Sequence, residues 1–308
     1  MTRAVVFAYH NVGARCLRVL RAHDIDVPLV VTHDDDPAEV LWFERVADVA
    51  DDLGVAYAAP ADANDPAFIA QVAALAPDFI FSFYYRRMLS EQLLATARRG
   101  ALNMHGSLLP HYRGRAPVNW AVLRGERRTG ATLHYMAAKP DAGDIVTQQA
   151  VPILPDDTAR EVFDKVTVAA EICLDAVLPA LVAGTAPRRP NDIAHGSYYG
   201  GRCPEDGRID WSRDARSIHN LVRAVAPPYP GAFTTVAGRL ARVLRTRLPA
   251  DAAAWKPGTP ATLAIDGGAM IATCGGATVL RVDALEVESE LQSPETLARR
   301  WGQVLPLA

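Results

Sequence analysis

The chain has 308 residues, of which half are hydrophobic and 22% are charged, and its formal net charge is −3. This length is enough for one large domain or for a domain with a smaller companion, and the composition is that of a globular protein. The slightly negative charge gives no general attraction to nucleic acid, so we expect no nucleic-acid partner.

The cysteines and the apolar runs exclude further classes of protein. Four scattered cysteines without a C-x-x-C pair indicate neither a zinc site nor a disulfide framework, so we expect no metal. The N-terminal apolar run is too short for a signal peptide, and no run approaches the ~20 apolar residues of a membrane span. We therefore expect a cytoplasmic protein without a membrane partner.

The first hundred residues alternate short apolar runs with segments of helical spacing. Strands are predicted at Ala4–Tyr9, Val27–Thr32, Val55–Tyr57 and Phe79–Phe83. Helices are predicted at Ala14–Ala22, Glu39–Leu53, Pro66–Leu75 and, beginning at a Ser90 cap, a short one with Leu93 and Leu94 facing inward. This alternation predicts an α/β domain with a doubly wound, mostly parallel, Rossmann-like sheet.

Two strand ends in this domain carry polar or aromatic groups. The turn after the first strand, Y-H-N-V-G, has one glycine and lacks G-x-G-x-x-G, which excludes a classical dinucleotide site. His10 and Asn11 in that turn could contact a ligand, or Asn11 could cap the following helix. The strand at Ile80–Tyr85 ends in two tyrosines and is followed by Arg86 and Arg87. These aromatic and cationic groups could bind a flat anionic ligand, or the arginines could simply be solvated.

The stretch Ala101–Asn119 carries the strongest chemical signal. Asn103 and His105 lie two residues apart on a predicted strand, so their side chains share one face. A base beside an amide that can donate to an oxyanion is what acyl or formyl transfer needs. A half-buried polar pair at a strand end would look the same. The loop that follows is rich in Gly and Pro, which favours a rigid path.

The next segment continues the α/β pattern. We predict a helix over Pro117–Leu123, strands over Gly130–Tyr135 and Val146–Ile153, and a helix from Ala159 to about Ala183, capped at Asp157–Thr158. His134 is interpreted as a packing residue, and Asp144 as a turn residue. The long helix has an apolar stripe predicted to face the core: Val162, Val166, Ala169, Ile172, Cys173, Ala176 and Leu178.

The C-terminal third has a different pattern. A polar segment rich in Pro and Gly, residues 185–208, is interpreted as a linker. After a predicted helix at Ala215–Val225, short and evenly spaced apolar runs predict a small β-barrel, with a last helix at Ser293–Trp301. One run is rich in arginine and forms either a local basic patch or a solvated strand face; its members are Arg239, Arg242, Arg245 and Arg247.

The central stretch N-M-H-G-S-L-L-P-H-Y-R-G-R-A-P, followed by D-A-G-D-I at Asp141–Ile145, resembles the folate-dependent formyltransferase family. The resemblance implies that Asn103, His105 and Asp141 are catalytic. It also implies a catalytic domain over 1–184, the linker over 185–208 and an OB-like subdomain over 209–308. The implied folate contacts are Arg87, Met88, Leu89, Arg115, Ala137, Ala138, Lys139, Pro140 and Asp141.

Two more stretches, at Val5–Gly13 and Ile80–Leu89, resemble one branch of the family. This branch is the formyltransferase domain of the bifunctional polymyxin-resistance enzyme, which acts in lipid A modification. The resemblance implies 10-formyltetrahydrofolate as formyl donor and UDP-4-amino-4-deoxy-L-arabinose as acceptor. No decarboxylating domain follows Ala308, so we expect a stand-alone enzyme; another amino sugar, a separate decarboxylase and the oligomeric state stay open.

The expected roles follow from the chemistry of formyl transfer. His105 would act as general base and then as acid, Asn103 would donate to the oxyanion, and Asp141 would orient His105 and raise its pKa. Two rival functions share these residues. One is methionyl-tRNA formyl transfer, which the net charge does not favour. The other is non-catalytic binding of a folate or nucleotide.

Overall fold

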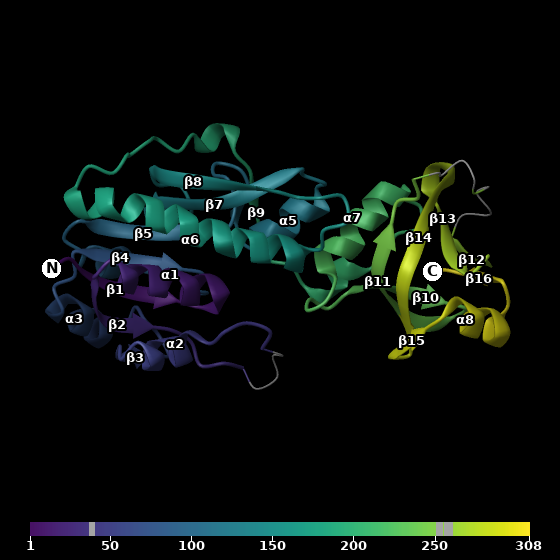
Figure 1. The fold of residues 1–308 in the computed structure, drawn as a ribbon, viewed down its shortest axis with the longest axis horizontal. Helices are drawn as coiled ribbons and strands as arrows, with labels where there is room; N and C mark the ends of the chain where they lie inside the picture. Colours follow the sequence, from purple (N-terminus) through teal and green to yellow (C-terminus); the bar gives the residue numbers. More distant parts are fainter. Residues whose placement is uncertain (37–40, 251–254, 256–260) are drawn as a thin grey trace. The chain divides into compact units, whose positions relative to one another are not determined.

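The computed structural model describes residues 1–36, 41–250, 255 and 261–308. Contacts divide the chain into two compact units (Figure 1). Unit 1 contains Met1–Pro117, Arg128–Pro152 and Phe163–Gly200, and unit 2 contains Val118–Arg127, Ile153–Val162 and Gly201–Ala308. Each unit has its own sheet, so each is described by itself.

Unit 1 is built on a seven-stranded sheet in the order β3-β2-β1-β4-β5-β7-β8. Its strands are β1 (Arg3–Ala8), β2 (Asp26–Val31), β3 (Tyr57–Ala58), β4 (Phe79–Phe83), β5 (Gly100–His105), β7 (Arg128–Tyr135) and β8 (Ile145–Pro152). The first five are parallel, and β7 and β8 are antiparallel. The strand order reverses between β1 and β4, as in a Rossmann-like sheet, which confirms the predicted fold.

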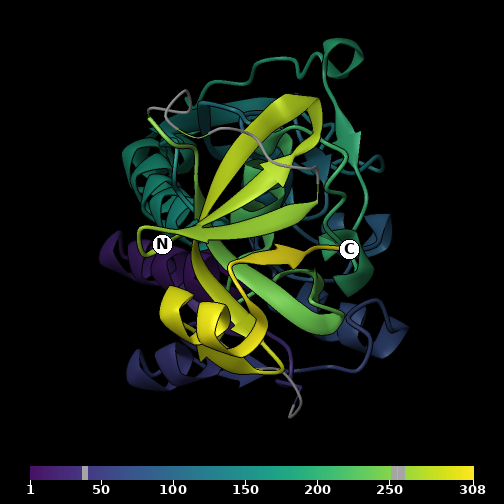
Figure 2. The ribbon, with the colours of Figure 1, turned by 90° about the vertical axis from the view of Figure 1, so that its right-hand side faces the viewer.

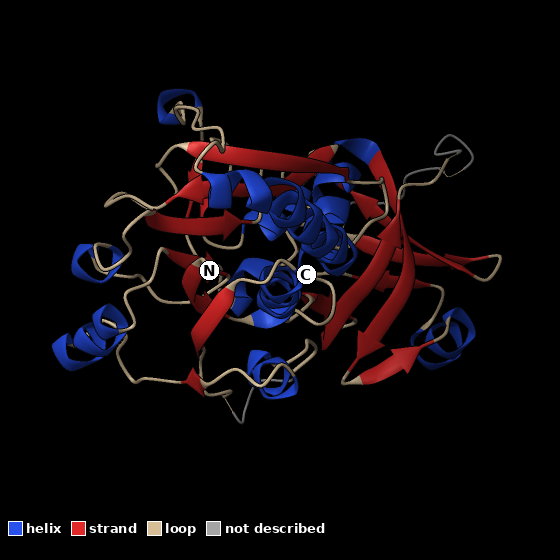
Figure 3. Cartoon of the chain, turned by 60° about the vertical axis from the view of Figure 1, so that its left-hand side comes forward, coloured by secondary structure: helices blue, strands red, loops and turns tan. Residues whose placement is uncertain are grey.

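Helices flank this sheet (Figure 3). They are α1 (His10–Ala22), α2 (Val46–Asp52), α3 (Pro66–Ala74), α4 (Glu91–Leu94) and most of α6 (Ala159–Ala183). Side chains cap two of them: Ser90 accepts from the Leu93 amide of α4, as predicted, and Asp65, which was not predicted as a cap, accepts from the first-turn amides of α3. The predicted helix Glu39–Leu53 is shorter, because it begins at Val46; residues 39 and 40 lie outside the described residues.

The α6 helix corrects two expectations. Its buried stripe includes Leu174 and Val177, whereas Ile172 is 49% exposed and Ala176 is also exposed, so the predicted stripe was partly out of phase. An 18-residue window of α6 has a mean hydropathy of 1.9, so by length and composition it passes the test for a membrane span. The expectation that no apolar run approaches a span is therefore wrong. Half of that window is buried, as in the core helix of a globular unit.

Unit 2 contains a curled antiparallel sheet in the order β10-β11-β14-β13-β12-β16, with β15 paired to β14 (Figure 2). Its strands are β10 (Ala232–Val236), β11 (Arg239–Arg247), β12 (Thr262–Asp266), β13 (Ala269–Cys274), β14 (Thr278–Val287), β15 (Glu290–Gln292) and β16 (Val304–Pro306). The sheet curls until its edges meet, and the Thr235 amide donates to the Ala308 carbonyl at 2.8 Å. The short runs predicted a small β-barrel, and the structure has this curled antiparallel sheet, a half-barrel. Its helices are α5 (Pro117–Leu123), α7 (Ala215–Val225) and α8 (Pro294–Trp301).

The arginines of β11 each have a carboxylate partner. Arg239 pairs with Glu288 at 2.9 Å, Arg242 with Glu286 at 3.0 Å, Arg245 with Glu161 at 3.6 Å and Arg247 with Asp283 at 3.1 Å. Their charges are neutralised locally, so the strand does not offer the unpaired cations that bind phosphates. Of the two interpretations from sequence, this pairing favours the solvated strand face.

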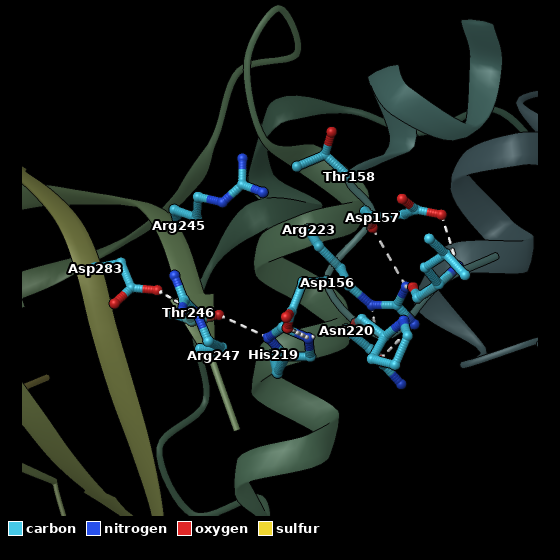
Figure 4. A network of polar contacts seen from close by, with 12 residues as sticks. Asp156, Asp157, Thr158, His219, Asn220, Arg223, Arg245, Thr246, Arg247 and Asp283 are labelled. Carbon is cyan, nitrogen blue, oxygen red and sulfur yellow. Dashed lines mark hydrogen bonds and ion pairs between the residues drawn. The ribbon is translucent and has the colours of Figure 1, made fainter. Parts of the chain in front are cut away.

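A buried polar network ties α7 to two other segments of unit 2 (Figure 4). Arg223, 6% exposed, donates to the Asn220 side chain and to the carbonyl oxygens of Leu154, Asp157 and Val122. His219 has both ring nitrogens engaged, with Thr246 Oγ1 at 2.9 Å and the Pro155 carbonyl at 2.9 Å. This network fixes segments 118–127 and 153–162 against one helix. At the start of α6, Thr158 and Glu161 form a capping box, as the predicted cap implied.

Candidate functional site

The strand β5 places Asn103 and His105 on one face of the unit 1 sheet, at the carboxyl end of the strand. The sequence predicted this arrangement from their spacing. The antiparallel neighbour β7 adds a third group, because His134 pairs directly with Asn103 across the two strands. Directly paired residues of antiparallel strands project from the same face. Two imidazoles and an amide therefore share a small patch of the sheet.

His105 is almost fully buried, with 6% of its surface exposed. Its Nε2 lies 2.8 Å from the Tyr112 carbonyl oxygen, which can only accept, so Nε2 carries the hydrogen. In the neutral ring Nδ1 then has the free lone pair, and it lies 3.5 Å from Asp141 Oδ1. The ring is therefore held at one nitrogen and can accept a proton at the other.

Burial lowers the pKa of His105, and this effect outweighs the opposing effects of Asp141 and the Tyr112 carbonyl. His134 and the Arg113 guanidinium lower the pKa further. The expectation that the pKa of His105 is raised is therefore wrong in its net direction, although Asp141 contributes with the predicted sign. The physical reason is that removal from water penalises the imidazolium more than one carboxylate favours it. His105 is accordingly neutral, and thus basic, at neutral pH.

Asp141 lies between the two histidines. Its Oδ1 is 3.5 Å from His105 Nδ1 and 3.5 Å from His134 Nε2, and its Oδ2 accepts from the Gly114 amide at 2.8 Å. Burial alone would raise the pKa of Asp141, but His105, His134 and the Gly114 amide together bring it well below its usual range. The carboxylate is therefore ionised where it can stabilise a protonated His105.

The loop after β5 is tightly packed. A Cβ at Gly106 would lie 1.9 Å from the Tyr84 hydroxyl oxygen, so no other residue fits there without a shift. Ser107 Oγ donates to the His111 carbonyl at 2.6 Å, and Thr132 Oγ1 donates to the Ser107 carbonyl at 2.6 Å. These bonds fix the path that carries the Tyr112 carbonyl to His105.

Part of the predicted linker is bound to this loop. β9 (Tyr198–Tyr199) pairs in parallel with β6 (Arg113–Gly114), and the Tyr112 amide donates to Ser197 Oγ at 2.8 Å. Asn191 Nδ2 donates to the Asp141 carbonyl at 2.9 Å. Within unit 1, this segment therefore holds both the loop that contacts His105 and the loop that carries Asp141. Its Pro- and Gly-rich composition suggested only a linker and gave no sign of this role.

The residues implied as folate contacts fall on two loops and the end of β4. The Arg87 guanidinium donates to the carbonyl oxygens of Pro60 and Ala61. Met88 is 60% exposed and Leu89 is buried at 5%, so Leu89 side-chain packing belongs to the core. The remaining members are exposed or partly buried: Arg115, Ala137, Ala138, Lys139 and Pro140. Their contact with folate stays a prediction.

A histidine that the sequence did not single out shapes the end of β4. His33 stacks on Tyr85 with ring centroids 4.1 Å apart, and its Nε2 accepts from the Arg86 amide at 3.1 Å. Burial, with help from Arg87 and Arg86, lowers the pKa of His33 to about 4. A neutral His33 is needed for that hydrogen bond. Its position after a parallel strand that neighbours β1 was the one available signal.

The start of α1, directly after β1, does not contain the helix cap that was one of the two interpretations made from sequence. His10 is 8% exposed and stacks on Phe43 with centroids 4.1 Å apart. Asn11 does not cap α1; its side chain accepts from the Glu44 amide at 2.8 Å instead. The aromatic contacts of His10 show that this side chain packs in the core of unit 1. Among the described residues, no group of three or more His, Cys, Asp or Glu has metal-site geometry.

Residues 3–178 match the formyl transferase family, and residues 203–299 match the formyl transferase C-terminal domain. An N-formyltransferase from Helicobacter canadensis, solved with folinic acid and dTDP-3-aminofucose, has a TM-score of 0.72 at 16% identity, covering 92% of this chain and 99% of that one. The sugar 3N-formyl transferase WlaRD, solved with dTDP and 5-N-formyl-THF, has a TM-score of 0.71 at 16% identity, over 95% and 98%. HypX from Aquifex aeolicus with tetrahydrofolic acid has 0.63 at 18%, over 96% and 46%. These likenesses show the fold.

Proposed function

The chain belongs to the formyl transferase family, and we propose that it transfers a formyl group from 10-formyltetrahydrofolate to the amine of a nucleotide-linked amino sugar. The observation that carries this proposal is the cluster formed by Asn103 and His105 on one face of β5 and by Asp141 from the loop between β7 and β8. It combines a neutral base, a carboxylate partner for that base and an amide donor. These are the groups that formyl transfer to an amine requires.

The base is His105 Nδ1, because Nε2 is held by the Tyr112 carbonyl. The amine nitrogen attacks the formyl carbon, and the proton that it loses moves to Nδ1. Asp141 Oδ1, 3.5 Å away, stabilises the imidazolium that results. The same proton then passes to the leaving folate nitrogen as the carbon–nitrogen bond to the donor breaks. The charges and protons balance, and His105 returns to its neutral state.

Asn103 has the oxyanion role. As the amine attacks, the formyl oxygen gains negative charge and needs a donor that is already in place. Asn103 Nδ2 has two hydrogens, and one of them is bound to His134 Nε2 at 3.1 Å. The other is available to the reacting oxygen. Loss of one such donor typically raises the barrier by ~3 kcal/mol.

The donor would lie along the end of β4 and the 137–141 loop, against Arg87, Met88, Leu89, Arg115 and residues 137–141. Two features of unit 1 support this placement. Arg86 and Arg87 put positive charge beside the stacked rings of His33 and Tyr85, which suits a flat anionic molecule. The carboxyl end of β4 also adjoins that of β5, which carries His105.

The acceptor is proposed as a nucleotide-linked amino sugar because the solved neighbours named above include two sugar formyltransferases. The finer choice, UDP-4-amino-4-deoxy-L-arabinose and hence lipid A modification, rests on the two branch-like stretches of the sequence. Both proposed substrates are water-soluble, so we propose a cytoplasmic reaction. The locally paired arginines of β11 do not favour a tRNA acceptor.

A formyl-transfer assay with three acceptors in parallel tests the proposal. The purified protein and 10-formyltetrahydrofolate are offered UDP-4-amino-4-deoxy-L-arabinose, a dTDP-linked 3-amino sugar and methionyl-tRNA, and products are identified by mass. We expect formylation of a nucleotide sugar and none of the tRNA. Formylation of the tRNA alone would replace the proposed acceptor. No transfer to any amine, with thermal stabilisation by folate, would indicate a binding protein.

A further inference from the structure

His134 is buried beside the catalytic groups but has no part in the reaction as described so far. It is 2% exposed and lies on β7, directly opposite Asn103 of β5. Its interpretation from sequence was packing. Both of its ring nitrogens nevertheless have specific polar neighbours, which simple packing does not require.

The hydrogen bonds of His134 determine its tautomer. Nδ1 lies 2.8 Å from the Tyr135 carbonyl oxygen, and because a carbonyl can only accept, Nδ1 carries the hydrogen. In the neutral ring Nε2 therefore has a lone pair. Asn103 Nδ2 lies 3.1 Å from Nε2 and is the group that donates to it.

This bond decides which way the Asn103 amide faces. An amide that rotates by half a turn exchanges its oxygen and nitrogen, and it would then direct its oxygen lone pairs at Nε2 of a neutral His134. That contact is repulsive, so His134 selects the rotamer in which the nitrogen faces the ring. With this end fixed, the second N–H of Asn103 has a defined direction.

We propose that His134 is a positioning residue that fixes the Asn103 amide so that its free N–H is directed at the reacting formyl oxygen. The inference rests on the proposed function and adds a fourth residue to its machinery. His134 itself does not touch the substrate. It acts through Asn103, as outer groups fix the orientation of the groups that react.

Asp141 is the competing partner for the same ring nitrogen. Its Oδ1 lies 3.5 Å from His134 Nε2, a longer separation than the 3.1 Å to Asn103 Nδ2. A carboxylate can only accept, so a bond to Asp141 would require a proton on Nε2. That proton would in turn require Asn103 to present its oxygen. The two arrangements are exclusive, and the shorter contact supports the one proposed.

The test uses four variants in the formyl-transfer assay with the acceptor that the wild-type enzyme uses. His134→Phe removes the acceptor and keeps the ring volume, and His134→Gln restores an acceptor near the position of Nε2. Asn103→Ala and the double variant with His134→Phe complete a double-mutant cycle. We expect His134→Phe to lower kcat about 10- to 100-fold, at most the lower end of the ~10²–10³-fold loss for a missing oxyanion donor because the donor is misdirected and not removed, with little change in either KM. His134→Gln should recover most of kcat.

The cycle separates positioning from a structural role. If His134 acts through Asn103, the His134→Phe substitution lowers kcat no further in the Asn103→Ala background. An equal loss of kcat in both backgrounds overturns the inference, as does a loss that appears in KM. A cycle of His134→Phe with Asp141→Asn that is non-additive, while the Asn103 cycle is additive, also overturns it.

A second readout does not depend on turnover. Long-range ¹H–¹⁵N correlation spectra of the resting protein, assigned with His134→Gln, should show a ring protonated at Nδ1 with a bare Nε2. A ring protonated at Nε2 overturns the inference. If the wild-type protein formylates no amine but the Nδ1 tautomer is observed, the proposed function fails while the His134–Asn103 bond stands.

Discussion

Each of the two units buries a histidine in a polar network, and the two networks differ in the group that faces the unprotonated ring nitrogen. In unit 2, His219 has a hydrogen-bond partner at each ring nitrogen, Thr246 and the Pro155 carbonyl, and the Asp156 carboxylate lies 3.7 Å from Nε2, the nitrogen that the carbonyl already holds. In unit 1, His105 is held at Nε2 by the Tyr112 carbonyl, while Nδ1 faces the Asp141 carboxylate at 3.5 Å. Burial lowers the pKa of both histidines. Burial therefore does not distinguish them, but the charge opposite the free lone pair does.

The same contrast holds for the groups around them. In unit 2, carbonyl and amide oxygens accept hydrogen bonds from all three guanidinium nitrogens of Arg223. Arg223 thereby links three chain segments. In unit 1, neighbouring residues orient the side chains of Asn103 and Asp141 but do not use all of their hydrogen-bonding atoms. A saturated network stabilises the fold, whereas a directed and incomplete one can receive a substrate. The predictions below test this difference.

The largest effect on activity is expected at Asp141. Asp141→Asn keeps an acceptor for the Gly114 amide but removes the charge that stabilises protonated His105. We expect kcat to fall about 10³-fold, within the range for general acid–base catalysis, with the unfolding midpoint near that of the wild type. Steady-state kinetics and urea unfolding check this. The matched control is Asp144→Asn, whose carboxylate pairs with Arg188 at 2.7 Å; a comparable loss of kcat there would contradict the assignment.

The largest effect on stability is expected at Arg223. Arg223→Met leaves buried carbonyl oxygens without donors, so unfolding should become easier by ~3 kcal/mol or more, since each unsatisfied group costs ~1–3 kcal/mol. The kcat of the folded protein should stay near wild type. Arg242→Met removes an exposed ion pair and is the control, with an expected effect within ~1 kcal/mol. Equal unfolding midpoints for the two variants would show that the buried network contributes little.

A backbone test affects the path that positions His105. Gly106→Ala places a methyl group 1.9 Å from the Tyr84 hydroxyl oxygen, which must move the loop or the ring. A displacement of about 1 Å can cost about 10²-fold in rate, so kcat should fall by that order. Removal of the hydroxyl with Tyr84→Phe should recover part of the loss in the double variant. A Gly106→Ala enzyme with wild-type kcat would show that the close contact does not position the base.

The pH dependence gives the smallest effect. Because burial lowers the pKa of His105, its basic form predominates at pH 6.5 and above and is lost as the pH falls below that value. The kcat/KM profile should therefore have an acidic limb below pH 6.5. Asp141 raises the pKa of His105, so the residual activity of Asp141→Asn should have its limb at a still lower pH. A limb that moves to higher pH in this variant would contradict the sign.

Stability should depend on pH in the same direction for His219. Its folded pKa is lowered, so the unfolded chain binds a proton more readily than the folded one. The stabilisation from neutral His219 is present above pH 6.5 and is lost as the pH falls from there through the folded pKa. Urea midpoints of wild type and His219→Gln should converge on acidification. A gap that widens would mean that protonated His219 is the stabilising form.

The sequence was sufficient for the strands and for the residues of the central stretch, because both depend on local pattern. The continuous apolar run at Ala4–Ala8 is fully buried in β1, and the two-residue spacing puts Asn103 and His105 on one face. The partner strand was not predictable in register, so His134 was assigned to packing. Residues 191–199 are bound to the loops around His105 and Asp141 by the β6–β9 pairing and by the Ser197 and Asn191 side chains, and composition does not encode these contacts. The pKa of His105 had the wrong predicted direction because burial cannot be read from one motif.

The most direct test of this account makes the same substitution at both histidines. Glutamine at either position can keep one polar contact but cannot act as a base. We expect His105→Gln to lower kcat at least about 10²-fold with an unfolding midpoint near wild type. We expect His219→Gln to lower the unfolding midpoint and to leave kcat near wild type. If His105→Gln turns over the formyl donor and amino sugar at the wild-type rate, the cluster on β5 does not carry out the chemistry proposed here.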